Sequence, residues 1–244
     1  MKIVGVIPAR YASTRFPGKP LALLQGRPMI QWTIEGAMKS RLCSEVIVAT
    51  DSDEIALAAK AVGAKVVMTD SDLPTGTDRI YAAVKNLECD LIVNIQGDEP
   101  TVTGDLVDQL AQVFLDEPHL DMATLAHPIS EEDIPSLNAV KVIVNRNDEA
   151  LYFSRYPIPY SRLKFSEKPG ICLRHIGMYA YTKKFLKLFC ESQPADIEIA
   201  ESLEQLRALY LGASIKVVRV QQPSIGVDTP EDLAKLEKIL SQGM

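Results

Sequence analysis

The chain has 244 residues, 47% hydrophobic and 24% charged, with a formal net charge of −6. This composition is ordinary for a globular protein with a full core, and no apolar run approaches the ~20 residues that a membrane-spanning helix needs. Residues 1–41 hold seven basic residues and one acidic residue, a net +6, so the remainder carries −12. We therefore exclude nucleic acid, which selects a broad basic surface, and expect a small anionic ligand near the start. The opening residues lack a signal-peptide pattern, which predicts a cytoplasmic protein.

The first 130 residues alternate short apolar runs with helical patterns. Strands are predicted at 3–7, 45–50, 65–68, 91–96 and 122–126, and helices at 28–40, 53–62, 77–88 and 103–116. This alternation predicts an α/β, Rossmann-like fold, in which a mostly parallel sheet has helices on both faces.

The alternation changes near residue 128. Apolar runs at 139–145, 151–154 and 172–181 are not separated by helical patterns, which predicts an antiparallel or mixed arrangement. We assign residues 135–195 to a smaller inserted α+β subdomain, and residues 1–134 with 196–244 to a nucleotide-binding domain.

Three elements are predicted after residue 195. A helix over 197–211 has Ile199, Leu203, Leu206 and Tyr210 on its core face, and a strand follows over 215–220. The last helix starts at Thr229-Pro230 and runs to about 241, because Pro at the first helical position followed by acidic residues marks a helix start.

A basic loop follows the first predicted strand, where α/β proteins place a ligand. Arg10, Arg15 and Lys19 alternate there with small residues and prolines. Several fixed cations suit a polyphosphate, although a solvated basic loop is the alternative. Two nucleotide motifs are excluded, since Gly18-Lys19 precedes Pro20 rather than the Ser or Thr of a P-loop, and the glycine pattern of a dinucleotide-binding loop is missing.

Two aspartates are candidate metal ligands. Asp98 lies in the segment Gln96–Pro100 that closes the central strand, and Asp228 precedes the last helix. Both also fit ordinary roles, Asp98 in a turn and Asp228 as a helix cap. Since Thr229 suits the cap, Asp228 is available, and the two carboxylates would provide oxygen ligands for Mg²⁺ beside substrate phosphates.

Other polar residues are weaker candidates. Residues 75–79 (TGTDR) open a helix and suit contacts to a base or ribose, although Thr77 also suits a helix cap. Arginines pair with carboxylates, and side chains that suit an acidic sugar, or else solvent, are Arg155, Arg162, Arg174, His175, Glu204 and Gln205. The four cysteines and three histidines show no disulfide or zinc spacing.

Together these segments resemble the 3-deoxy-manno-octulosonate cytidylyltransferase family over essentially the whole chain. Residues 7–21 (IPARYASTRFPGKPL) are similar to the family's opening. Further similar segments follow in order: 48–51 (VATD), 94–100 (NIQGDEP), 150–155 (ALYFSR), 202–207 (SLEQLR) and 226–232 (GVDTPED). The related enzymes for N-acylneuraminate lack the FPGKP ending of the first loop.

The resemblance implies Mg²⁺-dependent transfer of CMP from CTP to 3-deoxy-D-manno-octulosonate (Kdo), with release of pyrophosphate, in lipopolysaccharide synthesis. It implies that the catalytic residues are Lys19, Asp98 and Arg15, and that Asp98 and Asp228 bind the metal. Implied CTP contacts are Arg10, Arg15, Lys19, Gly76, Thr77, Arg79 and Gln96. Implied Kdo contacts are Arg155, Arg162, His175, Glu204 and Gln205, with Arg162 in a segment that varies within the family. The family forms homodimers, largely through the inserted subdomain.

Two alternatives stay open at this point. The first is a nucleotidyltransferase for a related acceptor, such as 8-amino-Kdo or another sugar acid. The second belongs to another class, a nucleotide-binding module without catalytic activity, which the two acidic metal positions disfavour.

Overall fold

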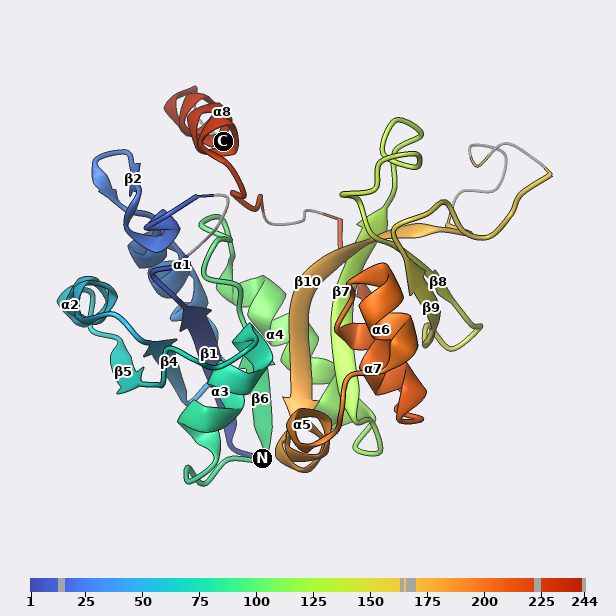
Figure 1. Ribbon diagram of the computed structural model, residues 1–244, viewed down its shortest axis with the longest axis horizontal. Coiled ribbons are helices and arrows are strands. Elements are labelled where there is room, and N and C mark those ends of the chain that lie inside the picture. Colours follow the sequence, from blue (N-terminus) through green and yellow to red (C-terminus); the bar gives the residue numbers. More distant parts are fainter. Residues whose placement is uncertain (13–15, 163–164, 166–169, 222–224, 243–244) are drawn as a thin grey trace. The chain divides into compact units, whose positions relative to one another are not determined.

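The structure is a computed structural model that describes the chain except residues 13–15, 163–164, 166–169, 222–224 and 243–244 (Figure 1). The chain forms two compact units. The first comprises Met1–Ala111 and Ser224–Met244, and the second comprises Gln112–Pro223. None of the described helices is long and apolar enough to cross a membrane.

The first unit is built on a parallel sheet with the strand order β6-β1-β4-β5. The bounds are β1 Ile3–Ala9, β4 Glu45–Thr50, β5 Lys65–Met68 and β6 Leu91–Asn94, which confirms the predicted strands of this region. Leu91, Ile92 and Val93 are each 0% exposed. Since successive side chains point to opposite faces of a sheet, both faces of β6 are covered, as expected for a central parallel strand.

Helices connect these strands, as predicted. They are α1 Met29–Ala37, α2 Asp53–Ala61, α3 Gly76–Val84 and α4 Gly104–Asp116. The first loop leads into a short 3₁₀ helix, η1 Lys19–Leu21, and a small hairpin of β2 Leu23–Leu24 and β3 Arg27–Pro28.

The last helix, α8 Pro230–Ser241, starts where the sequence predicts. Thr229 Oγ1 accepts a hydrogen bond from Asp232 N at 3.3 Å, and Asp232 Oδ2 accepts one from Thr229 N at 3.1 Å. This reciprocal capping box satisfies two backbone donors of the first turn. Thr229, and not Asp228, is therefore the cap, as predicted.

The second unit has a mixed, mainly antiparallel set of strands. They are β7 Met122–Pro128, β8 Lys141–Val144, β9 Ala150–Ser154, β10 Leu173–Thr182 and β11 Ile215–Arg219. β10 is antiparallel to β7 and β8, β8 is antiparallel to β9, and β11 is parallel to β7. The unit is wider than the predicted subdomain at 135–195, because β7 pairs with both β10 and β11.

The helices of this unit depart from the prediction. α5 Lys183–Glu191 was not expected. The predicted helix over 197–211 is two helices, α6 Asp196–Glu201 and α7 Gln205–Tyr210, because Ser202 adopts a left-handed φ of 52° and ends the first. The break changes which residues face the core. Leu203 and Leu206 are buried as predicted, whereas the prediction was wrong for Ile199 and Tyr210, which are 63% and 70% exposed.

Candidate functional site

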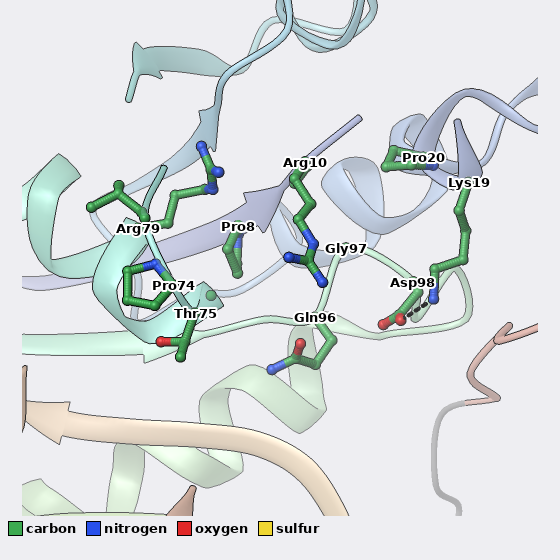
Figure 2. Close-up of a pocket in the computed structure, with 13 residues that line it drawn as sticks. Pro8, Arg10, Lys19, Pro20, Pro74, Thr75, Arg79, Gln96, Gly97 and Asp98 are labelled. Carbon is green, nitrogen blue, oxygen red and sulfur yellow. Dashed lines mark hydrogen bonds and ion pairs between the residues drawn. The ribbon is translucent and has the colours of Figure 1, made fainter. Parts of the chain in front are cut away.

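The first unit contains a pocket of about 290 Å³ at the carboxyl ends of β1 and β6, which is where open α/β sheets bind ligands. Its walls come from the loop after β1, from η1, from the start of α3 and from the segment after β6. In the view of Figure 2, Thr75 and Arg79 lie at one end and Lys19 and Asp98 at the other, with Arg10 and Gln96 between them.

The pocket is cationic. Arg10, Lys19 and Arg79 line it, and Asp98 is the only carboxylate among the described lining residues. The Arg10 side chain is exposed and pairs with no other described residue. Arginine and lysine donors are suited to phosphate oxygens, so the pocket is chemically matched to a polyphosphate, as the sequence predicts.

Two glycines allow the chain to build this pocket. Gly18 has a φ of +67°, which favours glycine, and its N–H donates to the Tyr11 carbonyl at 3.2 Å, closing the loop just before Lys19. A Cβ on Gly97 would lie 3.0 Å from the Pro8 carbonyl oxygen. The segment after β6 therefore approaches the end of β1 closely, which brings Asp98 near the first loop.

Lys19 forms ion pairs with both of the predicted metal ligands, Asp98 and Asp228. Its Nζ lies 2.5 Å from Asp98 Oδ2 and 3.4 Å from Asp228 Oδ1, and its side chain is 13% exposed. Val227 N donates to the Asp98 carbonyl at 2.9 Å, and this bond holds the segment before α8 against the segment after β6. The fold thus brings together the side chains of Lys19, Asp98 and Asp228, which are far apart in the sequence.

The two carboxylates fit a divalent cation. Both are within ion-pair distance of one ammonium, so a positive charge is already stabilised between them. Among the described residues, no three acidic, His or Cys side chains are grouped as a metal site. Mg²⁺ commonly binds one or two carboxylates and completes its shell with water and substrate phosphates, so a carboxylate pair beside a phosphate pocket is a suitable donor set.

Asp51 is a site residue that the sequence reasoning did not assign. Arg79, 2% exposed, donates to Asp51 Oδ2 at 3.0 Å and to Thr69 Oγ1 at 2.5 Å. Asp51 Oδ1 in turn accepts from Tyr11 N at 3.3 Å. Arg79 therefore acts largely through Asp51, which anchors the start of the loop after β1. The position of Asp51 just after a parallel strand was the available indication.

Other predicted CTP contacts have different outcomes. Gly76 and Gln96 line the pocket, and Gln96 Nε2 donates to Asn94 Oδ1 at 3.2 Å. Thr77 is 2% exposed and does not line it. The alternative that Thr77 caps a helix is wrong, because Thr75 Oγ1 accepts from Asp78 N and caps α3. Arg15 lies outside the described residues.

A second polar cluster lies within the second unit, formed by His175, Tyr179, Glu204 and Gln205. The His175 and Tyr179 rings have centroids 5.4 Å apart, and Tyr179 Oη donates to Gln205 Oε1 at 3.2 Å. Burial and the Glu204 carboxylate raise the pKa of Tyr179, so it stays protonated. The structure thus brings together three of the predicted Kdo contacts and adds Tyr179, which the sequence reasoning missed because it reads as an apolar strand residue.

Gln205 is the most informative member of this cluster. It is 3% exposed, and its Nε2 finds no hydrogen-bond acceptor among the described residues. A buried donor without an acceptor costs about 1–3 kcal/mol, so such groups are rare and need an explanation. A bound ligand that places an oxygen atom beside Nε2 would satisfy this donor. The alternative that Gln205 is simply solvated is wrong, because the residue is buried.

The predicted arginines differ in their surroundings. Arg155 donates to the carbonyls of Glu201, Leu137 and Ser202 at 2.9, 3.1 and 3.2 Å. Its guanidinium therefore holds the turn between α6 and α7, two residues before Glu204. Arg174 is paired with Asp133 at 2.8 Å, and Arg162 is exposed.

A parallel sheet with a cationic pocket at its strand ends and a pair of carboxylates beside that pocket is typical of an α/β nucleotide-binding protein of the phosphate-transfer type. Residues 4–216 match the sequence family described as cytidylyltransferase. The chain is 71% identical to 3-deoxy-manno-octulosonate cytidylyltransferase of Bdellovibrio bacteriovorus over the whole of both proteins, and 46% identical to that of Acaryochloris marina over 100% of this chain and 99% of the relative. The chain therefore belongs to the 3-deoxy-manno-octulosonate cytidylyltransferase family.

A solved structure agrees with this assignment. The structure of CMP:2-keto-3-deoxy-manno-octonic acid synthetase complexed with CTP superposes with a TM-score of 0.95, at 43% identity and with 100% of both chains covered. The Rossmann-like, mostly parallel fold predicted from the sequence is confirmed.

Proposed function

We propose that this protein transfers CMP from CTP to Kdo and releases pyrophosphate, giving CMP-Kdo for lipopolysaccharide synthesis. The observation that carries the proposal is the convergence of Asp98 and Asp228 on Lys19 at the edge of a cationic pocket. The full-length similarity to 3-deoxy-manno-octulosonate cytidylyltransferases supplies the two substrates.

CTP would bind with its phosphates against Arg10 and Lys19, which line the pocket. Arg15, from the same loop, is proposed for the same role. Gly76 and Gln96, on the pocket's other walls, are the proposed contacts for the nucleoside. Arg79 and Asp51 would keep the loop in place through the bond to Tyr11 N, so that the cations are positioned before CTP arrives.

The proposed reaction is an in-line displacement. The anomeric hydroxyl oxygen of Kdo forms a bond to the α-phosphorus of CTP, and the bond from that phosphorus to the bridging oxygen of the β-phosphate breaks. Lys19 and Arg10 stabilise the charge that spreads over the phosphate oxygens. The hydroxyl proton passes to Asp98, which we favour over Asp228 because Asp98 lines the pocket.

Mg²⁺ is part of the proposal, with Asp98 and Asp228 as its protein ligands. Mg²⁺ held there would neutralise phosphate charge and favour loss of the hydroxyl proton of Kdo. The two side chains are already held at one cation by their ion pairs with Lys19. The matching of the carboxylate pair to the usual Mg²⁺ donor set supports this assignment.

Kdo would bind in the second polar cluster. The amide of Gln205 offers a buried donor, and Tyr179 and His175 border it. Arg155 would act on the same site indirectly. It bonds the Ser202 carbonyl in the α6–α7 turn and so would help to position Glu204, which follows two residues later. Arg162 keeps its proposed role in binding the carboxylate.

Pyrophosphate release with different substrate pairs tests the function. We expect turnover with CTP, Mg²⁺ and Kdo, and much slower turnover with UTP or ATP. Faster turnover with 8-amino-Kdo or another sugar acid would establish the related acceptor instead. CTP binding without pyrophosphate release under any of these conditions would establish a non-catalytic nucleotide-binding module.

We also infer that the protein is a homodimer in the cytoplasm, as the family resemblance implies. Large exposed side chains in the 135–195 segment support an interface there. Leu151, Tyr156 and Tyr160 are 57%, 70% and 90% exposed. Light scattering during size-exclusion chromatography should give twice the chain mass of 26.9 kDa, and a mass of one chain would contradict the dimer.

A further inference from the structure

Thr124, in the middle of β7, contacts the most irregular part of β10. The residue is 0% exposed. Its Oγ1 lies 2.8 Å from the Met178 carbonyl oxygen, 3.2 Å from the Ile176 carbonyl oxygen and 2.9 Å from His175 Nε2. One buried hydroxyl therefore joins two backbone carbonyls and an imidazole.

These contacts occur at a bulge. Ile176 is paired with Leu125 and Tyr179 with Thr124, so Gly177 and Met178 are additional residues on β10. Residues four apart on an unbroken strand lie about 13 Å apart, yet the His175 and Tyr179 rings have centroids 5.4 Å apart. The bulge thus helps bring both side chains into one cluster, as bulges near functional sites commonly do.

The hydroxyl of Thr124 has one hydrogen to donate. The partner that receives this hydrogen decides which tautomer of His175 is favoured. The carbonyl oxygens only accept, and the Met178 carbonyl is the closest partner. When the hydroxyl donates to Met178, its oxygen accepts from His175 Nε2–H, and both bonds are made. The opposite tautomer would take the hydrogen away from the carbonyl. The Nε2–H form therefore satisfies more of the buried groups.

The second ring nitrogen is then an acceptor. His175 Nδ1 has no hydrogen-bond partner among the described residues, and the side chain is partly exposed. Phe153 packs edge-on against the ring with centroids 5.0 Å apart, which restricts its rotation. Desolvation lowers the pKa of His175 to about 3, so the ring is neutral near physiological pH.

We propose that Thr124 is a positioning residue that holds His175 as the Nε2–H tautomer and thereby presents Nδ1 as an acceptor to a hydroxyl group of the sugar-acid acceptor. This inference rests on the proposed function. A neutral acceptor nitrogen attracts O–H and N–H groups and repels carboxylate oxygens. His175 thus selects a hydroxyl, whereas the buried Gln205 amide selects an oxygen acceptor such as the carboxylate.

The test uses two matched substitutions. Thr124→Val removes the hydroxyl and keeps the branched shape, and Thr124→Ser keeps the hydroxyl. We expect Thr124→Val to raise the KM for Kdo by ~10-fold, as for the loss of one hydrogen-bonded contact, with the KM for CTP within about twofold. Thr124→Ser should restore the wild-type KM for Kdo. An unchanged KM for Kdo in Thr124→Val, or equal rises for both substrates, would overturn the proposal.

A spectroscopic measurement separates this inference from the proposed function. In ¹⁵N-histidine-labelled wild-type protein, His175 should give one protonated and one unprotonated ring nitrogen, with Nε2 as the protonated one. The signals are assigned by their loss in His175→Gln. A protonated Nδ1, or a doubly protonated ring at neutral pH, overturns the inference even if CMP-Kdo is formed. The predicted tautomer in a protein that does not use Kdo would refute the function alone.

Discussion

At the scale of single residues, the Lys19 ammonium is balanced by two carboxylates at 2.5 and 3.4 Å. In the proposed reaction this charge stabilises the transferring phosphate. Lys19→Met retains most of the length of the unbranched side chain and removes the charge. We expect turnover to fall by at least ~10²-fold, by analogy with removing one transition-state donor.

Measured pyrophosphate release, with Lys60→Met as the control, checks this prediction. Lys60 is exposed on α2 and lies outside the pocket, so its replacement should leave turnover near normal. Near-normal turnover in Lys19→Met would show that Lys19 has no catalytic role.

The two aspartates should differ in effect although both contact Lys19. Asp98 lines the pocket and Asp228 does not, so Asp98→Asn should lose at least ~10²-fold in turnover even at saturating Mg²⁺. Asp228→Asn should chiefly raise the Mg²⁺ concentration needed for half-maximal rate, because one of two protein ligands is weakened. Titration of activity with Mg²⁺ after EDTA treatment measures both. The same Mg²⁺ requirement in Asp228→Asn as in wild type would contradict its assignment as a ligand.

Among the structural elements, the turn between α6 and α7 is held from two directions. Glu201 accepts from Ser154 Oγ at 2.7 Å and from Arg155 N at 2.9 Å, which ties the turn to the end of β9. The buried pair of Arg207 with Glu198, at 2.6 Å, ties α7 to α6. Gln205 is therefore positioned by its neighbours.

Glu201→Gln tests this role. The substitution weakens two bonds that a charged group accepts, and we expect the free energy of unfolding to fall by about 1–3 kcal/mol and the KM for Kdo to rise while that for CTP stays unchanged. Urea denaturation and steady-state kinetics measure the two effects. Glu191→Gln, at an exposed residue of α5, is the matched control. If both variants unfold at the same urea concentration, the turn is not stabilised by Glu201.

The elements also show what the sequence can and cannot predict. The strands of the first unit follow from short apolar runs, and α8 follows from its Thr-Pro start, because local chemistry decides these features. α5 was missed although Thr182 caps it and Phe185, Leu186 and Phe189 are buried at helical spacing. The division of residues 196–210 depends on a left-handed residue at Ser202, a conformation that Ser does not favour intrinsically and that tertiary bonds to Arg155 support.

Site residues divide in the same way. The placement of Arg10, Lys19 and Asp98 at the pocket, and of Asp228 beside Lys19, was predictable from recognisable motifs that follow a strand or precede a helix. The contacts of Tyr179 and Thr124 were not predictable, because they arise at the bulge in β10, which no local pattern marks. The roles of Arg79 and Arg155 in holding loops likewise depend on partners distant in the sequence.

For the whole molecule, His175 should make stability depend on pH. Its pKa is lowered to about 3 from 6.5 by desolvation, so between these values the unfolded chain binds a proton that the folded protein excludes. The free energy of unfolding therefore falls as pH decreases below 6.5. At one pH unit below 6.5 the loss from this group is roughly 1 kcal/mol.

Urea denaturation at about pH 7.5 and 5.5 measures this loss. His175→Gln, which cannot titrate, should lose less stability between the two conditions than wild type does. The exposed His119→Gln should behave like wild type. Equal losses in wild type and His175→Gln would show that the folded protein protonates His175 freely.

The central claim is that this chain joins CMP to Kdo. The most direct measurement is ³¹P NMR of a reaction containing the wild-type protein, CTP, Kdo and Mg²⁺. The account predicts loss of the three CTP resonances and the appearance of pyrophosphate together with one phosphodiester resonance, in equal molar amounts, and neither product in the Lys19→Met reaction over the same time. Unchanged CTP in the wild-type reaction, or conversion of CTP to CDP and phosphate, would contradict it.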